Sequence, residues 1–126
     1  MVCHGDPHLG NLLVGDGAAV WLVDWDDAVL APPEIDLMFV VGGLPGFAPV
    51  DARQRAWFFE GYAGEELDQD RLVYYRSVRA LVDAADWAAR AADPGTVTDA
   101  RRQALDIVRG VLAPDGLVDL ALSPPE

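Results

Sequence analysis

The segment His4-Gly5-Asp6-Pro7-His8-Leu9-Gly10-Asn11, followed by Val23-Asp24-Trp25-Asp26, decides the fold of the first part of the chain. Two short apolar runs connect these segments, and Gly15-Asp16-Gly17 separates the runs as a turn signal. Apolar runs on both sides of such a turn are typical of a β-hairpin. Because a hairpin brings its two ends together, the sequence predicts that Asn11 and Asp24 lie close in space although they are 13 positions apart.

Three side chains of these segments have the chemistry that phosphoryl transfer requires. The reaction needs a base for the attacking hydroxyl and oxygen ligands for magnesium. Asp6 fits the base, while the amide oxygen of Asn11 and the carboxylate of Asp24 are hard ligands that Mg²⁺ accepts. A carboxylate at the end of an apolar strand is costly to bury unless it is paired or bound to a metal, which favours metal ligation by Asp24. Asp26 is either a further ligand or an exposed acid.

Two other polar residues are expected to support this loop. His4 is predicted to hydrogen-bond within the loop. Asp36 lies near a helix start, where a carboxylate commonly accepts backbone N–H groups. A nucleophilic pair of Cys3 and His4 is disfavoured, because adjacent residues of a strand point to opposite faces.

Composition restricts the partners. The 126 residues, 52% of them hydrophobic, suffice for about one small domain. A net charge of -12 disfavours nucleic acid and an anionic membrane surface, although an acidic face can attract cationic small molecules such as aminoglycosides. The single cysteine, Cys3, excludes an intrachain disulfide and fits the reducing cytoplasm.

The remaining sequence predicts a mostly helical α+β fold, a small hairpin on a helical bundle. Strands are expected at 11–14 and 20–25, loops at 31–33 and 42–49, and helices at 34–41, 52–62, 69–92 and 98–112, with Asp51, Asp68 and Thr98 or Thr96 as N-caps. Helical spacing predicts two buried stripes, one of Leu72, Tyr75, Val78 or Arg79, Val82, Ala85 and Ala89, the other of Ala104, Leu105, Val108, Val111 and Leu112. Aromatic residues of the second helix, Trp57, Phe58 and Phe59, are expected in the core.

The strings HGDPHLGN and LVDWDDAVLAPPEIDLMF resemble the aminoglycoside phosphotransferase and choline kinase family, relatives of the protein kinases. The catalytic loop of that family reads H-G-D-x-x-x-x-N, and its metal aspartate lies in an I/V-D-W motif. Asp6, Asn11 and Asp24 match these positions, and Asp36 matches a later aspartate that buttresses the loop. The second string looks most like the spectinomycin phosphotransferase branch.

The resemblance implies a protein-kinase-like C-terminal lobe over residues 1–116, with a catalytic-loop hairpin followed by a helical bundle, and a tail at 117–126. It also implies a phosphotransferase that uses ATP or GTP and Mg²⁺. The implied acceptor is a hydroxyl of an aminoglycoside-like antibiotic or a related amino-alcohol, and the implied role is antibiotic resistance in the cytoplasm.

The sequence also supports other interpretations. It contains no lysine and no Gly-rich phosphate loop, the features by which a kinase N-terminal lobe grips its nucleotide. We therefore expect either a lobe that associates with a missing N-terminal lobe or with itself, or a truncated, non-catalytic remnant or binding module. A metallophosphoesterase is a third alternative, because Asp6-Pro7-His8 spells D-x-H.

Overall fold

The structure is a computed structural model that describes residues 1–44, 48–64 and 66–123. It divides into two compact units, Met1–Leu72 and Val73–Glu126. Among the described residues, the strands lie in the first unit. Short β-ladders and a buried apolar cluster hold this unit together. The second unit is helical. The predicted mostly helical α+β class is confirmed.

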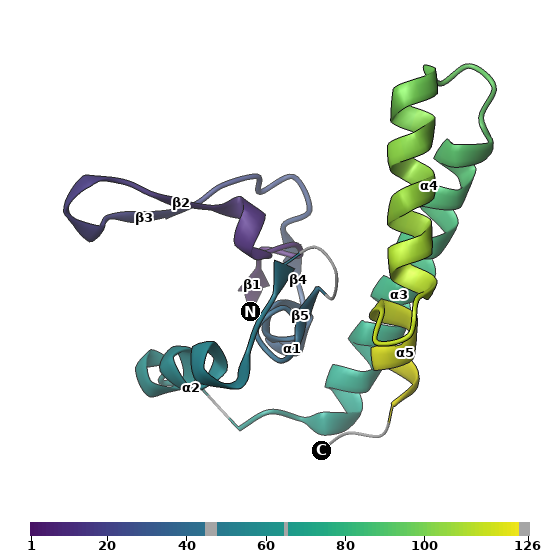
Figure 1. The fold of residues 1–126 in the computed structure, drawn as a ribbon. Helices are drawn as coiled ribbons and strands as arrows, with labels where there is room; N and C mark the ends of the chain where they lie inside the picture. Colours follow the sequence, from purple (N-terminus) through teal and green to yellow (C-terminus); the bar gives the residue numbers. More distant parts are fainter. Residues whose placement is uncertain (45–47, 65, 124–126) are drawn as a thin grey trace. The chain divides into compact units, whose positions relative to one another are not determined.

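The predicted hairpin is present in the first unit (Figure 1). Strand β2, Leu12–Val14, pairs antiparallel with β3, Val20–Leu22, and Leu12 lies opposite Leu22. The turn between them has a left-handed Gly17 (φ +70°), a conformation that glycine adopts without a steric penalty. One further backbone bond, from Val23 N–H to the Asn11 carbonyl (2.9 Å), extends the pairing to the end of the hairpin that carries the candidate ligands.

A second ladder frames the segment that precedes the hairpin. Strand β1, Val2–Cys3, pairs antiparallel with β4, Val29–Leu30, so that Cys3 lies opposite Val29. The sequence did not predict β4, because two residues between an acidic run and Ala31-Pro32-Pro33 carry too little periodicity to indicate a strand. This ladder fixes the point at which the chain enters the loop of residues 4–11.

Helix α1 is shorter than predicted. It spans Glu34–Leu37 and is followed by turns to residue 42, whereas the sequence predicted a helix over 34–41. Its apolar side chains continue into the turn, where Met38 and Phe39 are buried together with Leu37. The predicted loop at 42–49 instead contains a pair of two-residue strands, β5 (Gly43–Leu44) and β6 (Ala48–Pro49); residues 45–47 lie outside the described residues.

Helix α2, Ala52–Gly61, has the predicted N-cap Asp51, which forms a capping box with Gln54. The prediction that its aromatic residues are buried is wrong. Every side chain of α2 is exposed or half-buried, and Trp57 and Phe58 are 57% and 40% exposed. The rings pack on one another and on a cation: Phe58 stacks on Tyr62 at 5.5 Å, and the Arg53 guanidinium lies 4.4 Å from the Trp57 ring.

Helices α3, Gln69–Ala92, and α4, Thr98–Leu112, confirm the predicted bounds. The chain reverses direction between them, and Arg101 Nε of α4 donates to the Ala91 carbonyl of α3 at 3.1 Å (Figure 1). Asp93 forms the turn by accepting from Gly95 N–H and from the Thr96 hydroxyl, and these hydrogen bonds lower the pKa of the Asp93 carboxyl.

The predicted Asp68 cap of α3 is confirmed, because Asp68 Oδ1 accepts from Arg71 N–H at 3.1 Å, whereas the predicted cap of α4 and both buried stripes need correction. Val97 is the N-cap of α4, without a side-chain cap bond, so neither Thr98 nor Thr96 caps it. The buried positions of α3 are Leu72, Arg76 and Ala80, whereas Val82, Ala85 and Ala89 are exposed. In α4 Ala104 and Val111 are buried as predicted, and Leu105 and Leu112 are exposed.

The segment expected to be a tail forms another helix. Helix α5 spans Leu117–Leu122, packs on α4, and buries Leu117 and Ala121. Residues 124–126 lie outside the described residues. Within the described ranges, the helices are all too short or too polar to cross a bilayer.

Candidate functional site

The loop of residues 4–11 is anchored by a carboxylate from helix α1. Asp36 Oδ2 accepts the backbone N–H of His4 at 2.7 Å, and Asp36 Oδ1 accepts that of Gly5 at 2.8 Å. Hydrogen bonds to an ionised acceptor are about twice as strong as neutral ones. One side chain therefore fixes two successive peptide groups directly before Asp6.

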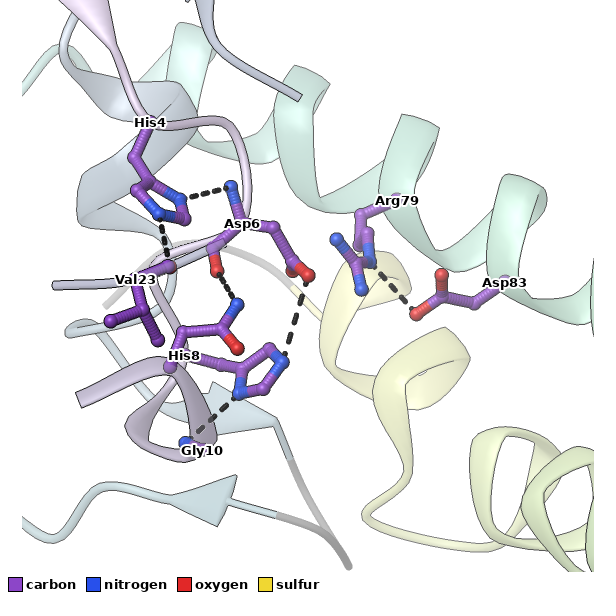
Figure 2. Close-up of polar contacts among 8 residues, drawn as sticks. His4, Asp6, His8, Gly10, Val23, Arg79 and Asp83 are labelled. Atoms are coloured by element: carbon purple, nitrogen blue, oxygen red, sulfur yellow. Dashed lines mark hydrogen bonds and ion pairs between the residues drawn. The ribbon is translucent and has the colours of Figure 1, made fainter. Parts of the chain in front are cut away.

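The His4 ring joins this loop to the end of the hairpin. Its Nδ1 accepts from Asp6 N–H (3.2 Å), which can only donate, so the ring proton lies on Nε2 and is donated to the Val23 carbonyl at 2.8 Å. His4 is buried, and Trp25 packs on it with ring centroids 4.7 Å apart. Figure 2 shows the His4 ring between Asp6 and Val23. Thus His4 places the residue before Asp24 next to the residue that carries the candidate base.

Gly5 permits the close approach of two backbone segments. Its φ of +89° is a left-handed value that side-chain-bearing residues rarely adopt. A Cβ at this position would lie 2.4 Å from the Asp27 carbonyl oxygen. The glycine therefore lets the chain pass directly against the acidic segment that follows the hairpin.

Asp6 and Asn11, predicted as base and metal ligand, are brought together. Asn11 is buried, and its Nδ2 donates to the Asp6 backbone carbonyl at 2.8 Å. This bond uses the amide nitrogen and leaves the Oδ1 end of the amide as the group that can serve as a hard oxygen ligand. The Asp6 side chain is 19% exposed, which is compatible with access by a substrate hydroxyl.

Asp24 has an unusual backbone conformation. Its φ of +65° is left-handed, a conformation that aspartate tolerates better than most residues. The side chain is exposed, so the cost of burying a carboxylate, which the sequence analysis used to favour metal ligation, does not apply. Trp25 closes the turn by donating from Nε1 to the Leu22 carbonyl at 2.8 Å.

The donor set fits magnesium better than a metal that prefers nitrogen or sulfur. Asn11 would supply an amide oxygen, and Asp24 would supply a carboxylate after the strand that pairs with the Asn11 segment. Mg²⁺ is commonly held by one or two protein carboxylates plus water and phosphate oxygens, so two protein ligands suffice. Asp26 is exposed, like its neighbour Asp27. Within residues 1–44, 48–64 and 66–123, no three His, Cys, Asp or Glu side chains converge on one metal position.

The sequence did not predict the contacts of two further residues of the site, His8 and Glu34. His8 is the N-cap of the 3₁₀ turn Leu9–Asn11, and its Nδ1 accepts from Gly10 N–H at 3.0 Å. Glu34 is almost fully buried and accepts from Asp68 N–H at 3.0 Å, which ties α1 to the start of α3. A polar residue before a short turn signals a cap, whereas a buried glutamate gives no sequence signal of its own.

Cys3 is placed to be inert rather than nucleophilic. The thiol is buried, and its Sγ lies 3.5 Å from the Ala31 carbonyl. Burial, and secondarily the negative charge of Asp36, raises the pKa of the Cys3 thiol above its ordinary value. Only the thiolate is strongly nucleophilic, so the Cys3-His4 alternative is not supported.

This environment predicts that the folded chain resists alkylation. At pH 8 Cys3 should carry less thiolate than an ordinary cysteine, because a raised pKa shifts deprotonation to higher pH. Iodoacetamide labelling followed by mass spectrometry should give slow modification of the folded chain and fast modification in urea. Equal rates in both conditions would contradict the burial of Cys3.

The chain is similar to known proteins in both sequence and structure. A model of the "Phosphotransferase enzyme family" (APH) matches residues 1–81. The crystal structure of the AMP-bound complex of spectinomycin phosphotransferase, APH(9)-Ia, is 31% identical with a TM-score of 0.81, and the match covers 99% of this chain and 38% of that one. Its complex with ADP and spectinomycin gives 31% identity and a TM-score of 0.83, over 97% of this chain and 37% of that one.

The chain thus spans little more than a third of the solved relatives it matches. Comparison with curated proteins gave no significant match. The family match covers more than half of the chain and contains the loop, the hairpin and the Asp36 anchor. These findings confirm the resemblance noted in the sequence, and the chain belongs to the phosphotransferase enzyme family.

Proposed function

We propose that this chain supplies the catalytic lobe of an ATP-dependent phosphotransferase whose acceptor is a hydroxyl of an aminoglycoside-like antibiotic or a related amino-alcohol. One observation carries the proposal: the loop holds Asp6 and Asn11 together through the 2.8 Å bond from Asn11 Nδ2 to the Asp6 carbonyl. The hairpin then returns the chain to this loop directly before Asp24.

In this mechanism Asp6 accepts the proton of the acceptor hydroxyl while the hydroxyl oxygen attacks the γ-phosphorus of ATP. The bond between the γ-phosphorus and its bridging oxygen breaks, and ADP leaves. Asn11 Oδ1 and the Asp24 carboxylate would hold Mg²⁺, which supplies charge neutralisation on the phosphates when bound. Asp36 and His4 support catalysis indirectly, because their hydrogen bonds fix the backbone N–H groups of His4, Gly5 and Asp6.

Charge supports a cationic acceptor. The chain carries a net charge of -12, and Asp26 and Asp27 are exposed next to the candidate ligand Asp24. An acidic surface raises the local concentration of cationic molecules and repels anionic ones. We propose that Asp26 contributes to the negative potential that attracts a cationic acceptor. The solved spectinomycin phosphotransferase in complex with ADP and spectinomycin supports an adenine nucleotide and such a small molecule as the two substrates.

The proposal extends to the organisation of the whole enzyme. Residues 1–116 correspond to the catalytic lobe, and α5 adds to the helical part of that lobe. A nucleotide lobe would be supplied by a further segment or another chain, and the requirement for ATP together with the buried, reduced Cys3 favours the cytoplasm. A second candidate, a non-catalytic binding module, is favoured by the absence of lysine from the sequence.

Calorimetric titration with ATP tests the proposed metal and nucleotide half-site. We expect ATP to bind the full chain in the presence of Mg²⁺ and more weakly in its absence. The substitution Asp24→Asn should weaken the Mg²⁺-dependent affinity by about tenfold, equivalent to about 1.4 kcal/mol, because it removes a charged ligand while asparagine still tolerates the left-handed backbone.

Asp16→Asn is the matched control, since it removes the same charge from the exposed turn at the other end of the hairpin. It should leave the affinity unchanged. If ATP bound equally well without Mg²⁺, or if both substitutions weakened ATP binding equally, Asp24 would act only through the overall charge of the chain and not as a metal ligand. Absence of binding by the folded chain would instead support the non-catalytic alternative.

A further inference from the structure

His8, the N-cap of the turn Leu9–Asn11, also faces the candidate base Asp6. Its Nδ1 accepts from Gly10 N–H at 3.0 Å within the turn that ends at Asn11. Its Nε2 lies 3.6 Å from Asp6 Oδ2. Figure 2 shows the ring between the Asp6 carboxylate and Gly10.

The Gly10 contact determines which ring nitrogen carries the proton. A backbone N–H can only donate, so His8 Nδ1 must be the unprotonated acceptor. The proton of the neutral ring therefore lies on Nε2, the nitrogen that faces Asp6 Oδ2. The turn thereby presents a donor to the carboxylate.

The surroundings limit the freedom of both groups. The His8 side chain is 15% exposed and that of Asp6 is 19% exposed. The His8 ring also packs against buried Phe39, with centroids 6.5 Å apart. A separation of 3.6 Å is longer than a hydrogen bond, and catalytic contacts in ligand-free structures are commonly long and shorten in the substrate complex.

We infer that His8 is a positioning residue, which donates from Nε2 to the Asp6 carboxylate and so selects the side-chain rotamer in which Asp6 receives the proton of the acceptor. This inference rests on the proposed function, in which Asp6 is the base. The same ring caps the turn that delivers Asn11, so one side chain sets the distance between the base and a metal ligand.

Two substitutions separate positioning from capping. His8→Asn keeps a cap for Gly10 N–H, because asparagine is a favourable N-cap, but its short side chain has no donor at the place of Nε2. His8→Gln places its amide NH₂ near the position of Nε2 and gives up the cap. If His8 acted only as a cap, His8→Asn would disturb Asp6 less than His8→Gln. If His8 positions Asp6, His8→Asn disturbs Asp6 more than His8→Gln.

The first measurement is NMR of the full chain. Ring proton–nitrogen correlations should show the His8 proton on Nε2, and three-bond couplings should show one χ1 rotamer for Asp6. In His8→Asn we expect rotamer averaging at Asp6 with an unchanged Gly10 amide resonance, and in His8→Gln a single Asp6 rotamer. A proton on His8 Nδ1, or a single Asp6 rotamer in His8→Asn, would overturn the inference.

The second measurement is phosphoryl transfer from ATP to spectinomycin by the same three proteins. We expect kcat to fall about tenfold to 100-fold in His8→Asn, with the KM for ATP nearly unchanged, and to recover in His8→Gln. An equal fall in both variants would overturn the positioning role. Lack of transfer by the unsubstituted chain would count only against turnover without a nucleotide lobe, because the rotamer measurement decides the role of His8 without any turnover.

Discussion

Gly5→Ala is expected to lower the free energy of unfolding by about 3 kcal/mol. Two effects add at this position. The φ of +89° is strained for alanine, and the new Cβ would lie 2.4 Å from the Asp27 carbonyl oxygen. That contact is with backbone, so a side-chain rotation cannot relieve it. The hydrogen bond from Gly5 N–H to Asp36 at 2.8 Å resists a shift of the loop in the opposite direction.

Urea denaturation monitored by circular dichroism would measure this loss. Gly17→Ala is the matched control, because Gly17 also has a positive φ (+70°) but an added Cβ would meet nothing within 4 Å. We expect it to cost about 1 kcal/mol, from backbone strain alone. Equal losses for the two variants would show that the contact with Asp27 carries no energy.

Asp36→Ala is expected to cost about 3 kcal/mol, because it leaves two part-buried backbone N–H groups without their charged acceptor. Asp36→Asn should lower the free energy of unfolding by less, since an amide keeps one oxygen for one of the two donors. The loss should appear in the urea midpoint and as changed amide resonances of His4 and Gly5.

Asp106→Ala controls for the removal of a surface carboxylate. Asp106 pairs with Arg109 at 3.2 Å, and both side chains are more than half exposed. Such a pair contributes about 0–1 kcal/mol. If Asp36→Ala were as mild as Asp106→Ala, the loop would be held by its other contacts, namely those of the His4 ring and of Asn11.

The sequence predicted the elements whose signals are local. The hairpin follows from apolar runs around Gly15-Asp16-Gly17, and α2 follows from the Asp51 cap. Helix α5 was mistaken for a tail because Leu117 and Ala121 become buried only by contact with α4. Tertiary contacts of this kind determine structure that local propensity does not.

For the site, spacing identified the residues but not their geometry. Asp6, Asn11 and Asp24 were found by their chemistry and their position around the hairpin. The left-handed backbone of Asp24 and the bond from Asn11 Nδ2 to the Asp6 carbonyl depend on how the loop closes, which no pairwise spacing encodes. His8 was overlooked as a contact of Asp6 for the same reason.

The Asp36 anchor has a consequence for the order in which the chain acquires its shape during synthesis. The hairpin uses only near neighbours in sequence, so it can close soon after it leaves the ribosome. The loop cannot, because its two anchoring bonds span 32 and 31 positions and await Asp36. A nascent chain that stalls before that residue would have a formed hairpin next to a loop whose backbone is not yet fixed. Likewise, a transplant of the loop into another scaffold would have to include residues 1–39 as one block.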